Sequence, residues 1–362
     1  MKLWKTLIAA TAALFVSAPS AVAGEKQKKD NASATAAAPA PAAKSWMSRF
    51  NGSLVYENAL GMGTFTTKGE SAQPLWNMSY SVRLGYLLHE ASKLRLTLRL
   101  DMDQNVVENY ASANTRPHQF QLYDIRLSLG QGAFVGFVAD GFGPMSDKGE
   151  RQPVLSFDWS TTLIFPTAKA SQLANKYLGV SGGLTTHFTP LSWMDLRYGF
   201  GVTKNFNRFT NQVLDVSDVS LPTPSRANGA ENVAEGLVAL GGANLEWSLS
   251  HDIGLDFSWG VGLGDMGFTL GWTYFQSMTY ANFTKDELSS EFAKAGRGYS
   301  DLMRGVVEVS WAPITHFAVG LGWLVDQTPK NTSDGSFRFP WWDTTNGADN
   351  VQTFYLDLVA SF

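Results

Sequence analysis

Apolar and polar side chains alternate over long stretches of this chain, and a period of two residues belongs to β-strands. In residues 76–88 one face is apolar and the other carries Asn, Ser, Arg and Gly. Residues 94–103 repeat the pattern, with leucines opposite arginine, threonine and aspartate. A soluble sheet packed against a core could account for one such strand. Charges spaced regularly opposite an unbroken apolar face, in pair after pair, are typical of a sheet with lipid on one side and water on the other.

The alternation predicts twelve strands. They lie near residues 50–60, 76–88, 94–103, 119–129, 133–140, 175–188, 193–205, 233–249, 253–275, 299–312, 317–325 and 351–362. Short turns are expected near 90–93, 130–132, 189–192, 250–252 and 313–316. Long loops are expected near 61–75, 105–118, 141–174, 206–232, 276–298 and 328–350. The fold class is therefore all-β, a membrane-spanning antiparallel up-and-down β-barrel with short periplasmic turns and long extracellular loops.

Two segments leave fourteen strands open as an alternative. Residues 154–159, inside the expected loop 141–174, could start an extra hairpin. Residues 253–275 are long for one strand, and their apolar face changes parity near Gly264. We interpret that change as a β-bulge in a strand that extends beyond the membrane.

The first 45 residues are expected to lie outside the barrel. Residues 1–23 have the basic start, apolar middle and small-residue cleavage site of a secretory signal peptide. Residues 24–45 are rich in Ala, Pro and Lys and are expected to form a disordered periplasmic leader, so that the barrel takes up 46–362. The chain has no cysteine, which excludes a disulfide scaffold and a catalytic thiol. Its net charge of −4 argues against nucleic acid as a partner.

The last strand carries an apolar residue at every second position and ends in phenylalanine: Phe354, Leu356, Leu358 and Phe362 share one face. This pattern resembles the assembly signal of bacterial outer-membrane β-barrel proteins. The resemblance implies an outer-membrane location among lipids and lipopolysaccharide. It also implies periplasmic chaperones and the barrel-insertion machinery as partners.

The expected inner face is rich in charge. The residues predicted to line a pore are Arg83, Arg95, Arg99, Asp101, Asp103, Asp124, Arg126, Asp195, Arg197, Asp256, Arg304, Glu308 and Asp357. Four of the arginines come from three consecutive strands and should form one basic wall, with acids predominating elsewhere. Opposed charged walls favour a porin-like channel for passive diffusion of small polar solutes or ions, without cofactor. In the alternative, the charges pair and plug a narrow barrel.

An enzyme is the second class of function. Outer-membrane phospholipases and lipid A deacylases use a histidine at the outer rim, and His118 near Ser112 and Asn114 is placed for such a lipid hydrolase. The other histidines, His89, His187, His251 and His316, are expected at the periplasmic strand ends. No metal site is expected, because the segment that opens like a calcium loop at Asp101 has Val106 where glycine is required.

The outer loops concern both the channel and a third class, a structural or adhesive protein. In the channel, the 141–174 loop could narrow the pore by folding inward, and Asp158, Trp159 and Lys169 would then meet the solute. A structural or adhesive barrel would instead act through loops 206–232 and 328–350, the latter with Trp341 and Trp342.

Overall fold

The computed structural model describes residues 46–61, 76–106, 120–139, 143–145, 149, 151–215, 237–280, 298–330, 335–339 and 350–362. The expected signal peptide and leader, as well as Trp341 and Trp342, lie outside the described residues.

Twelve antiparallel strands close into one barrel when β4 and β5 are counted as a single interrupted strand. They are β1 (Phe50–Gly61), β2 (Trp76–His89), β3 (Leu94–Asn105), β4 (Phe120–Leu122) with β5 (Ile125–Phe137), β6 (Leu155–Phe165), β7 (Lys176–Leu191), β8 (Met194–Asn207), β11 (Leu245–Val261), β12 (Gly264–Thr279), β13 (Tyr299–Ile314), β14 (Phe317–Gln327) and β15 (Asn350–Ser361). The expected fold class and strand number are confirmed.

The smaller elements are η1 (Trp46–Arg49), α2 (Lys169–Leu173) and a hairpin of β9 (Asn211–Asp215) and β10 (Leu237–Ala243). Among the described residues, no helix is long and apolar enough to cross a membrane.

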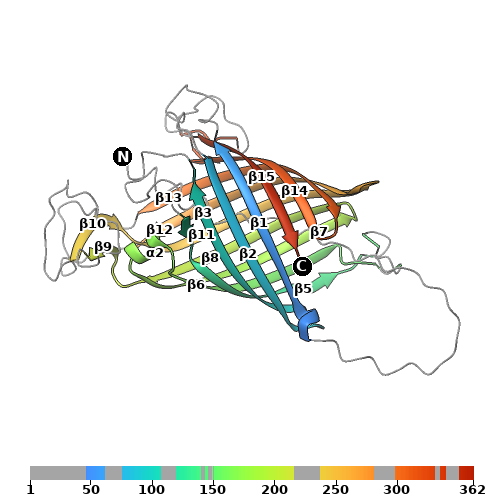
Figure 1. Cartoon of the computed structure of the whole chain (residues 1–362), viewed down its shortest axis with the longest axis horizontal. Coiled ribbons are helices and arrows are strands. Elements are labelled where there is room, and N and C mark those ends of the chain that lie inside the picture. The colour runs from blue at the N-terminus through green and yellow to red at the C-terminus, as the bar shows by residue number, and fades with distance from the viewer. Residues whose placement is uncertain are drawn as a thin grey trace.

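The first and last strands close the barrel, as Figure 1 shows for β1 in blue beside β15 in red. Their register runs from Ser53 opposite Ser361 to Gly61 opposite Thr353. One further pair extends it, because the Gly52 amide donates to the Phe362 carbonyl over 2.8 Å and the Phe362 amide donates back over 3.0 Å. Closure leaves no exposed edge, which a sheet in lipid requires.

The outer surface of the barrel is apolar. Large hydrophobic side chains stand exposed along the strands, for example Leu321 at 62% and Phe354 at 42%. A soluble protein would bury such residues, whereas a barrel presents them to lipid. The apolar face predicted from the alternation is therefore the outer face.

The sequence misplaces one strand, because 119–129 and 133–140 form a single strand and not a hairpin. The segment read as a turn at 130–132 is a bulge, since Gln131 pairs with Trp159 and Val135 with Phe157, so that three residues oppose Asp158 alone. Ala133 in this bulge has φ of +48°, and glycines on either side make the segment resemble a turn. The connection lies at 138–154, and β6 occupies part of the expected loop 141–174.

A second boundary is also corrected. The expected turn at 250–252 lies inside β11, and the connection is the two-residue turn 262–263, followed by Gly264 at φ of +113°. The change of parity near Gly264 is thus a change of strand and not a bulge. His251 and Asp252 form a polar pair that looks like a turn, but one side chain faces outward and the other inward.

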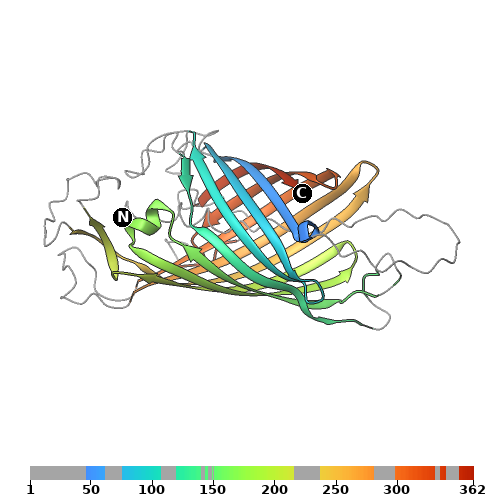
Figure 2. The same cartoon turned by 60° about the horizontal axis from the view of Figure 1, so that its bottom comes forward.

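The two ends of the barrel differ. At one end β2–β3, β7–β8, β11–β12 and β13–β14 are joined by two to four residues, at 90–93, 192–193, 262–263 and 315–316. Both η1 and Phe362 lie at this end, which is periplasmic by the usual asymmetry of such barrels. The other end carries α2 and the β9–β10 hairpin (Figure 2).

Candidate functional site in the barrel lumen

The inner wall carries the charged residues that the alternation predicts there. The structure places twelve of the thirteen on the inner face, alternating with the exposed apolar residues of the same strands. The thirteenth, Asp124, lies in the break between β4 and β5, where its side chain is buried. Their part in solute passage remains a prediction. The close-packed clusters that they form depend on the register.

Three arginines form a row across neighbouring strands. Arg83 on β2 pairs with Arg99 on β3, and Arg99 pairs with Arg126 on β5. Asp101 lies beside them, with its carboxylate 2.8 Å from the Arg99 Nε. Arg95 is not in this row, because it pairs with Gly130 and Leu87 nearer the periplasmic end.

An acidic cluster lies on β1, β15 and β13, beside the strands that carry the arginines. Glu57 on β1 is the register partner of Asp357 on β15. Glu308 on β13 accepts a hydrogen bond of 2.8 Å from the Tyr355 hydroxyl, and the Tyr355 ring lies over Gly322. Sequence alternation placed Tyr355 on the inner face but gave no sign that it would hold a carboxylate.

A buried ion pair lies toward the outer end. Arg304 donates from Nε to Asp326 over 2.7 Å and from a terminal nitrogen over 2.9 Å, and both side chains are almost fully buried. This two-point geometry is the strong form of an arginine–carboxylate contact. Asp326 was not expected here, because the predicted strand ended at residue 325.

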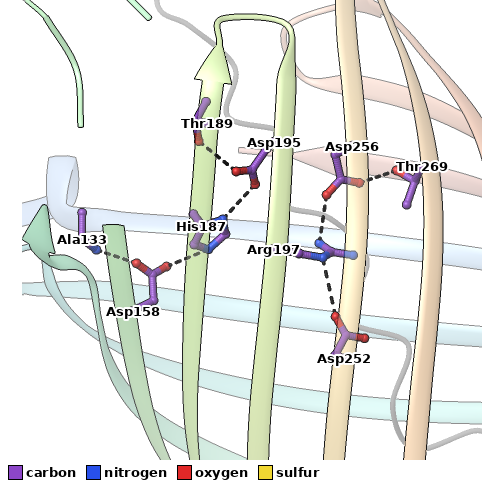
Figure 3. A network of polar contacts seen from close by, with 9 residues as sticks. All are labelled: Ala133, Asp158, His187, Thr189, Asp195, Arg197, Asp252, Asp256 and Thr269. Carbon is purple, nitrogen blue, oxygen red and sulfur yellow. Dashed lines mark hydrogen bonds and ion pairs between the residues drawn. The ribbon is translucent and has the colours of Figure 1, made fainter. Parts of the chain in front are cut away.

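A network of polar contacts covers the inner wall near the periplasmic end (Figure 3). His187 on β7 stands between two carboxylates, with Nδ1 2.8 Å from Asp195 and Nε2 3.6 Å from Asp158. The Ala133 amide donates to Asp158 over 2.6 Å, which ties the β5 bulge to β6. Asp195 also accepts from the Thr189 hydroxyl over 2.8 Å. His187 lies near the periplasmic strand end, as expected.

The second half of Figure 3 is centred on Arg197 of β8. Its guanidinium lies 3.6 Å from Asp252 and 3.5 Å from Asp256, both on β11. The hydroxyl groups of Thr273 and Thr269 on β12 donate to these two carboxylates over 2.7 Å each. Every charge in this half of the network is therefore paired within the wall.

Asp124 and Asp103 are held by neighbouring side chains or loops. Asp124 accepts from the Ala168 amide over 3.0 Å and from the Ser171 hydroxyl over 2.6 Å, and it pairs with Lys176 at 2.8 Å. These contacts fasten the connection that carries α2. Asp103 accepts a 2.5 Å hydrogen bond from the Tyr123 hydroxyl. Both aspartates therefore serve the packing of the outer end.

The residues of the expected inward loop, and one of the histidines, are placed differently from expectation. Asp158 lines the wall from β6 and not from a loop, Trp159 faces outward beside Leu184, and Lys169 begins α2. His251 lies on the outer face, where the Tyr198 hydroxyl is 2.8 Å from its Nδ1. Its expected periplasmic position is wrong, because β11 runs on for ten residues beyond it. His118, Ser112 and Asn114 lie outside the described residues. Within the described part of the chain, no group of histidines and carboxylates could hold a metal ion.

The closed barrel, with an apolar outer surface and a charged wall inside, is that of a bacterial outer-membrane β-barrel protein of porin-like architecture. Among solved structures, it is similar to an outer membrane channel from Pseudomonas putida F1, with a TM-score of 0.47 and 8% identity over 86% of this chain and 95% of the other. It is also similar to the NanC porin (TM-score 0.38, 7% identity, 85% and 98% covered) and to OprB of Pseudomonas putida (TM-score 0.33, 9% identity, 86% and 94% covered). At such identities the likeness concerns the fold alone. No family model and no curated protein matches the sequence.

Proposed function

We propose that this protein is a passive diffusion channel for small hydrophilic solutes or ions in the bacterial outer membrane. The observation that carries the proposal is the separation of charge on one closed inner wall. The arginine row of Arg83, Arg99 and Arg126 occupies β2, β3 and β5, whereas Glu57, Asp357 and Glu308 occupy β1, β15 and β13. The two arcs are neighbours, because β1 pairs with β2. Charges of opposite sign on neighbouring arcs create a field along the wall of a water-filled lumen, and ring charges of this kind select among ions.

Exposure inside the barrel favours an open lumen over a plugged one. Asp158 and Asp252, on β6 and β11, keep 39% and 34% of their side-chain surface accessible although they point inward. The buried Arg304 and Asp326 pair fills the opposite part of the wall, with 5% and 6% accessible. Small inner residues such as Gly199 and Gly201 on β8 lie between the exposed aspartates. The water-accessible path is therefore expected along β6, β7, β8 and β11.

Planar-bilayer recording on the refolded full chain tests this proposal. We expect discrete conductance steps with a linear current–voltage relation near zero voltage, and none from heat-denatured protein in the same detergent. An absence of channel events over repeated insertions of folded protein would refute the channel function.

The proposal includes the location of the protein in the outer membrane and its export to that membrane. We expect cleavage of residues 1–23 on export and recognition of the last strand by the insertion machinery and by periplasmic chaperones. Recognition of the last strand is supported by the side chains of Phe354, Leu356 and Leu358, which lie on the outer face of β15, where another protein can contact them.

A further inference from the structure

We infer that a hydroxyl patch on the inner wall of β6, β7 and β8 binds neutral polyhydroxylated solutes, the chemical class of sugars and sugar alcohols. The inference rests on the proposed channel function, because it names a class of solute that the lumen would recognise. The patch consists of two register rows, which are Thr162, Ser181 and Thr203 in the first row and Ser160, Gly183 and Gly201 in the second.

Register extends the first row across six neighbouring strands. On one side, Ser128 of β5 is the partner of Thr162. On the other side, Thr203 is the partner of Ser248 on β11, and Ser248 pairs with Ser277 on β12. Because the strands of a barrel are tilted, such a row climbs around the wall as it crosses them. A solute can therefore pass from one hydroxyl group to the next along the inner wall.

The second row has little side-chain volume. Gly183 and Gly201 lie between Ser160 and Ser250 in this row. A methyl group at position 201 would come within 2.5 Å of the Ser250 hydroxyl, and one at position 183 within 3.1 Å of the Ser160 hydroxyl. The two hydroxyl groups therefore lie beside the glycines and form the surface of the wall there.

The hydroxyl groups keep acceptor capacity after their contacts within the wall. Thr203 donates to the Ser181 hydroxyl over 2.9 Å, and Ser181 donates to the Val202 carbonyl over 3.2 Å. A hydroxyl has one donor and two acceptor lone pairs, so both oxygens can still accept a hydrogen bond. Ser128 and Thr162 share a hydrogen bond of 2.8 Å, which uses only one of their two donors. A ligand that matches the patch must therefore donate as well as accept.

A buried amide without a partner lies beside the first row. Asn205 is the next inner-face residue of β8 after Thr203, and its Oδ1 lies 3.3 Å from the place where a methyl group on Gly179 would stand. Only 6% of Asn205 is exposed, yet its side-chain amide has no hydrogen-bond partner among the described residues. Buried polar groups in proteins are almost always paired. An amide both donates and accepts, so a hydroxyl group of the solute satisfies either end of it.

The charges around the patch favour a neutral ligand over an ion. The two rows themselves carry no ionisable side chain. The next inner-face row toward the periplasm contains Asp158 and Asp252, which lie 3.6 Å from His187 and Arg197 respectively. Arg126 on β5 belongs to the arginine row and lies outside the patch. An ion therefore finds no opposite charge on the patch, whereas a neutral polyol needs none.

Saturation-transfer-difference NMR of glucose with the full-length folded protein tests the site without relying on conduction. The detergent is an amine oxide, because a detergent with a sugar headgroup would compete. We expect a saturable signal, and a dissociation constant about five- to tenfold higher in Thr203→Val and in Asn205→Leu, since each loses a hydrogen bond to the solute. Thr203→Ser keeps the hydroxyl and should bind glucose as the wild type does.

Thr353→Val is the matched control, because it makes the same change on the inner face of β15, on the opposite side of the barrel. It should leave glucose binding unchanged. Triethylene glycol dimethyl ether is the matched control solute, since it is similar in mass but its ether oxygens only accept hydrogen bonds. It should not displace glucose, whereas sorbitol should. Heat-modifiable gel mobility verifies that each variant is folded.

The inference fails if the folded wild type gives no saturable glucose signal, if Thr203→Val and Asn205→Leu bind as the wild type does, or if Thr353→Val weakens binding as much as Thr203→Val. Displacement of glucose by the dimethyl ether as readily as by sorbitol would also overturn it. Conductance without glucose binding would refute the site and leave the channel standing. Glucose binding without conductance would leave the site standing and refute the channel.

Discussion

The Arg197 side chain lies flat over Gly254, its register partner on β11. A methyl group at position 254 would overlap the guanidinium and come within 2.8 Å of the Arg197 Cγ. Glycine at this position therefore allows Arg197 to reach both Asp252 and Asp256.

Gly254→Ala should displace Arg197 and weaken its two ion pairs. Overpacking at such a site costs about 1–3 kcal/mol, and we expect this loss in the free energy of unfolding, measured by urea titration in lipid vesicles. Gly260→Ala is the matched control on the same strand and face, because a methyl group there would come only to 3.6 Å from Asp265. Equal stability of the two variants would contradict the packing described for Arg197.

Cysteine labelling tests the faces of β11 in a protein that has no cysteine of its own. Ser250→Cys should react with a membrane-impermeant maleimide through the lumen, whereas His251→Cys, one residue further, should be protected by lipid. The comparison is made on folded protein in vesicles, with detergent-solubilised, denatured protein as the full-reaction reference. Faster labelling at 251 than at 250 would reverse the assignment of the two faces.

Asp326→Asn should destabilise the barrel strongly, because it leaves Arg304 buried beside a neutral side chain. Breaking a buried ion pair typically costs about 3–5 kcal/mol, whereas replacing both partners by apolar residues costs much less. Urea unfolding of Asp326→Asn and of the double variant Arg304→Met/Asp326→Leu separates the two effects. If the double variant is no more stable than Asp326→Asn, then Asp326 does not stabilise the barrel through its ion pair with Arg304.

Closure of the barrel should be sensitive to Gly52, because the Phe362 ring lies where a side chain at position 52 would stand. Gly52→Ala should lower the yield of folded protein in heat-modifiable mobility assays. Gly182→Ala, where a methyl group would meet only Val202 at 4.0 Å, should fold as the wild type does. Indistinguishable folding yields would show that the Phe362 ring moves aside without cost.

Ion selectivity should follow the arginine row. Arg99→Glu replaces the central positive charge of the row, so that the zero-current potential in a salt gradient should shift toward cation preference. Arg208→Gln at the outer rim should leave that potential close to the wild-type value. An unchanged potential in Arg99→Glu would place the selectivity of the lumen elsewhere.

Local residue patterns predict the face of the sheet on which a side chain lies, but they do not predict where every strand begins and ends. Gly130, Gly132 and Gly136 make the β5 bulge look like a turn. The strand continues because pairing with β6 resumes at Val135 and because the Ala133 amide donates to Asp158 across the bulge. His251 and Asp252 also look like a turn, because they are two polar residues in succession. No local signal shows that His251 shares a hydrogen bond with the Tyr198 hydroxyl or that Asp252 pairs with Arg197.

By itself, the sequence determined that the chain forms a closed antiparallel barrel ending in an outward-facing Phe362, with Arg83, Arg99 and Arg126 on the inner wall. Alternation is sufficient for this, because each strand residue must face either lipid or lumen. The expected number of twelve strands is also correct, but only because the strand that was divided in two offsets the omission of β6. Only the tertiary structure decided that the three arginines share one row, that Glu57 meets Asp357, and that Arg304 pairs with Asp326. Alternation cannot predict which residues are register partners, because shifting one strand by two residues leaves every side chain on the same face. The register is set by bulges and by pairing between strands that are distant in the sequence.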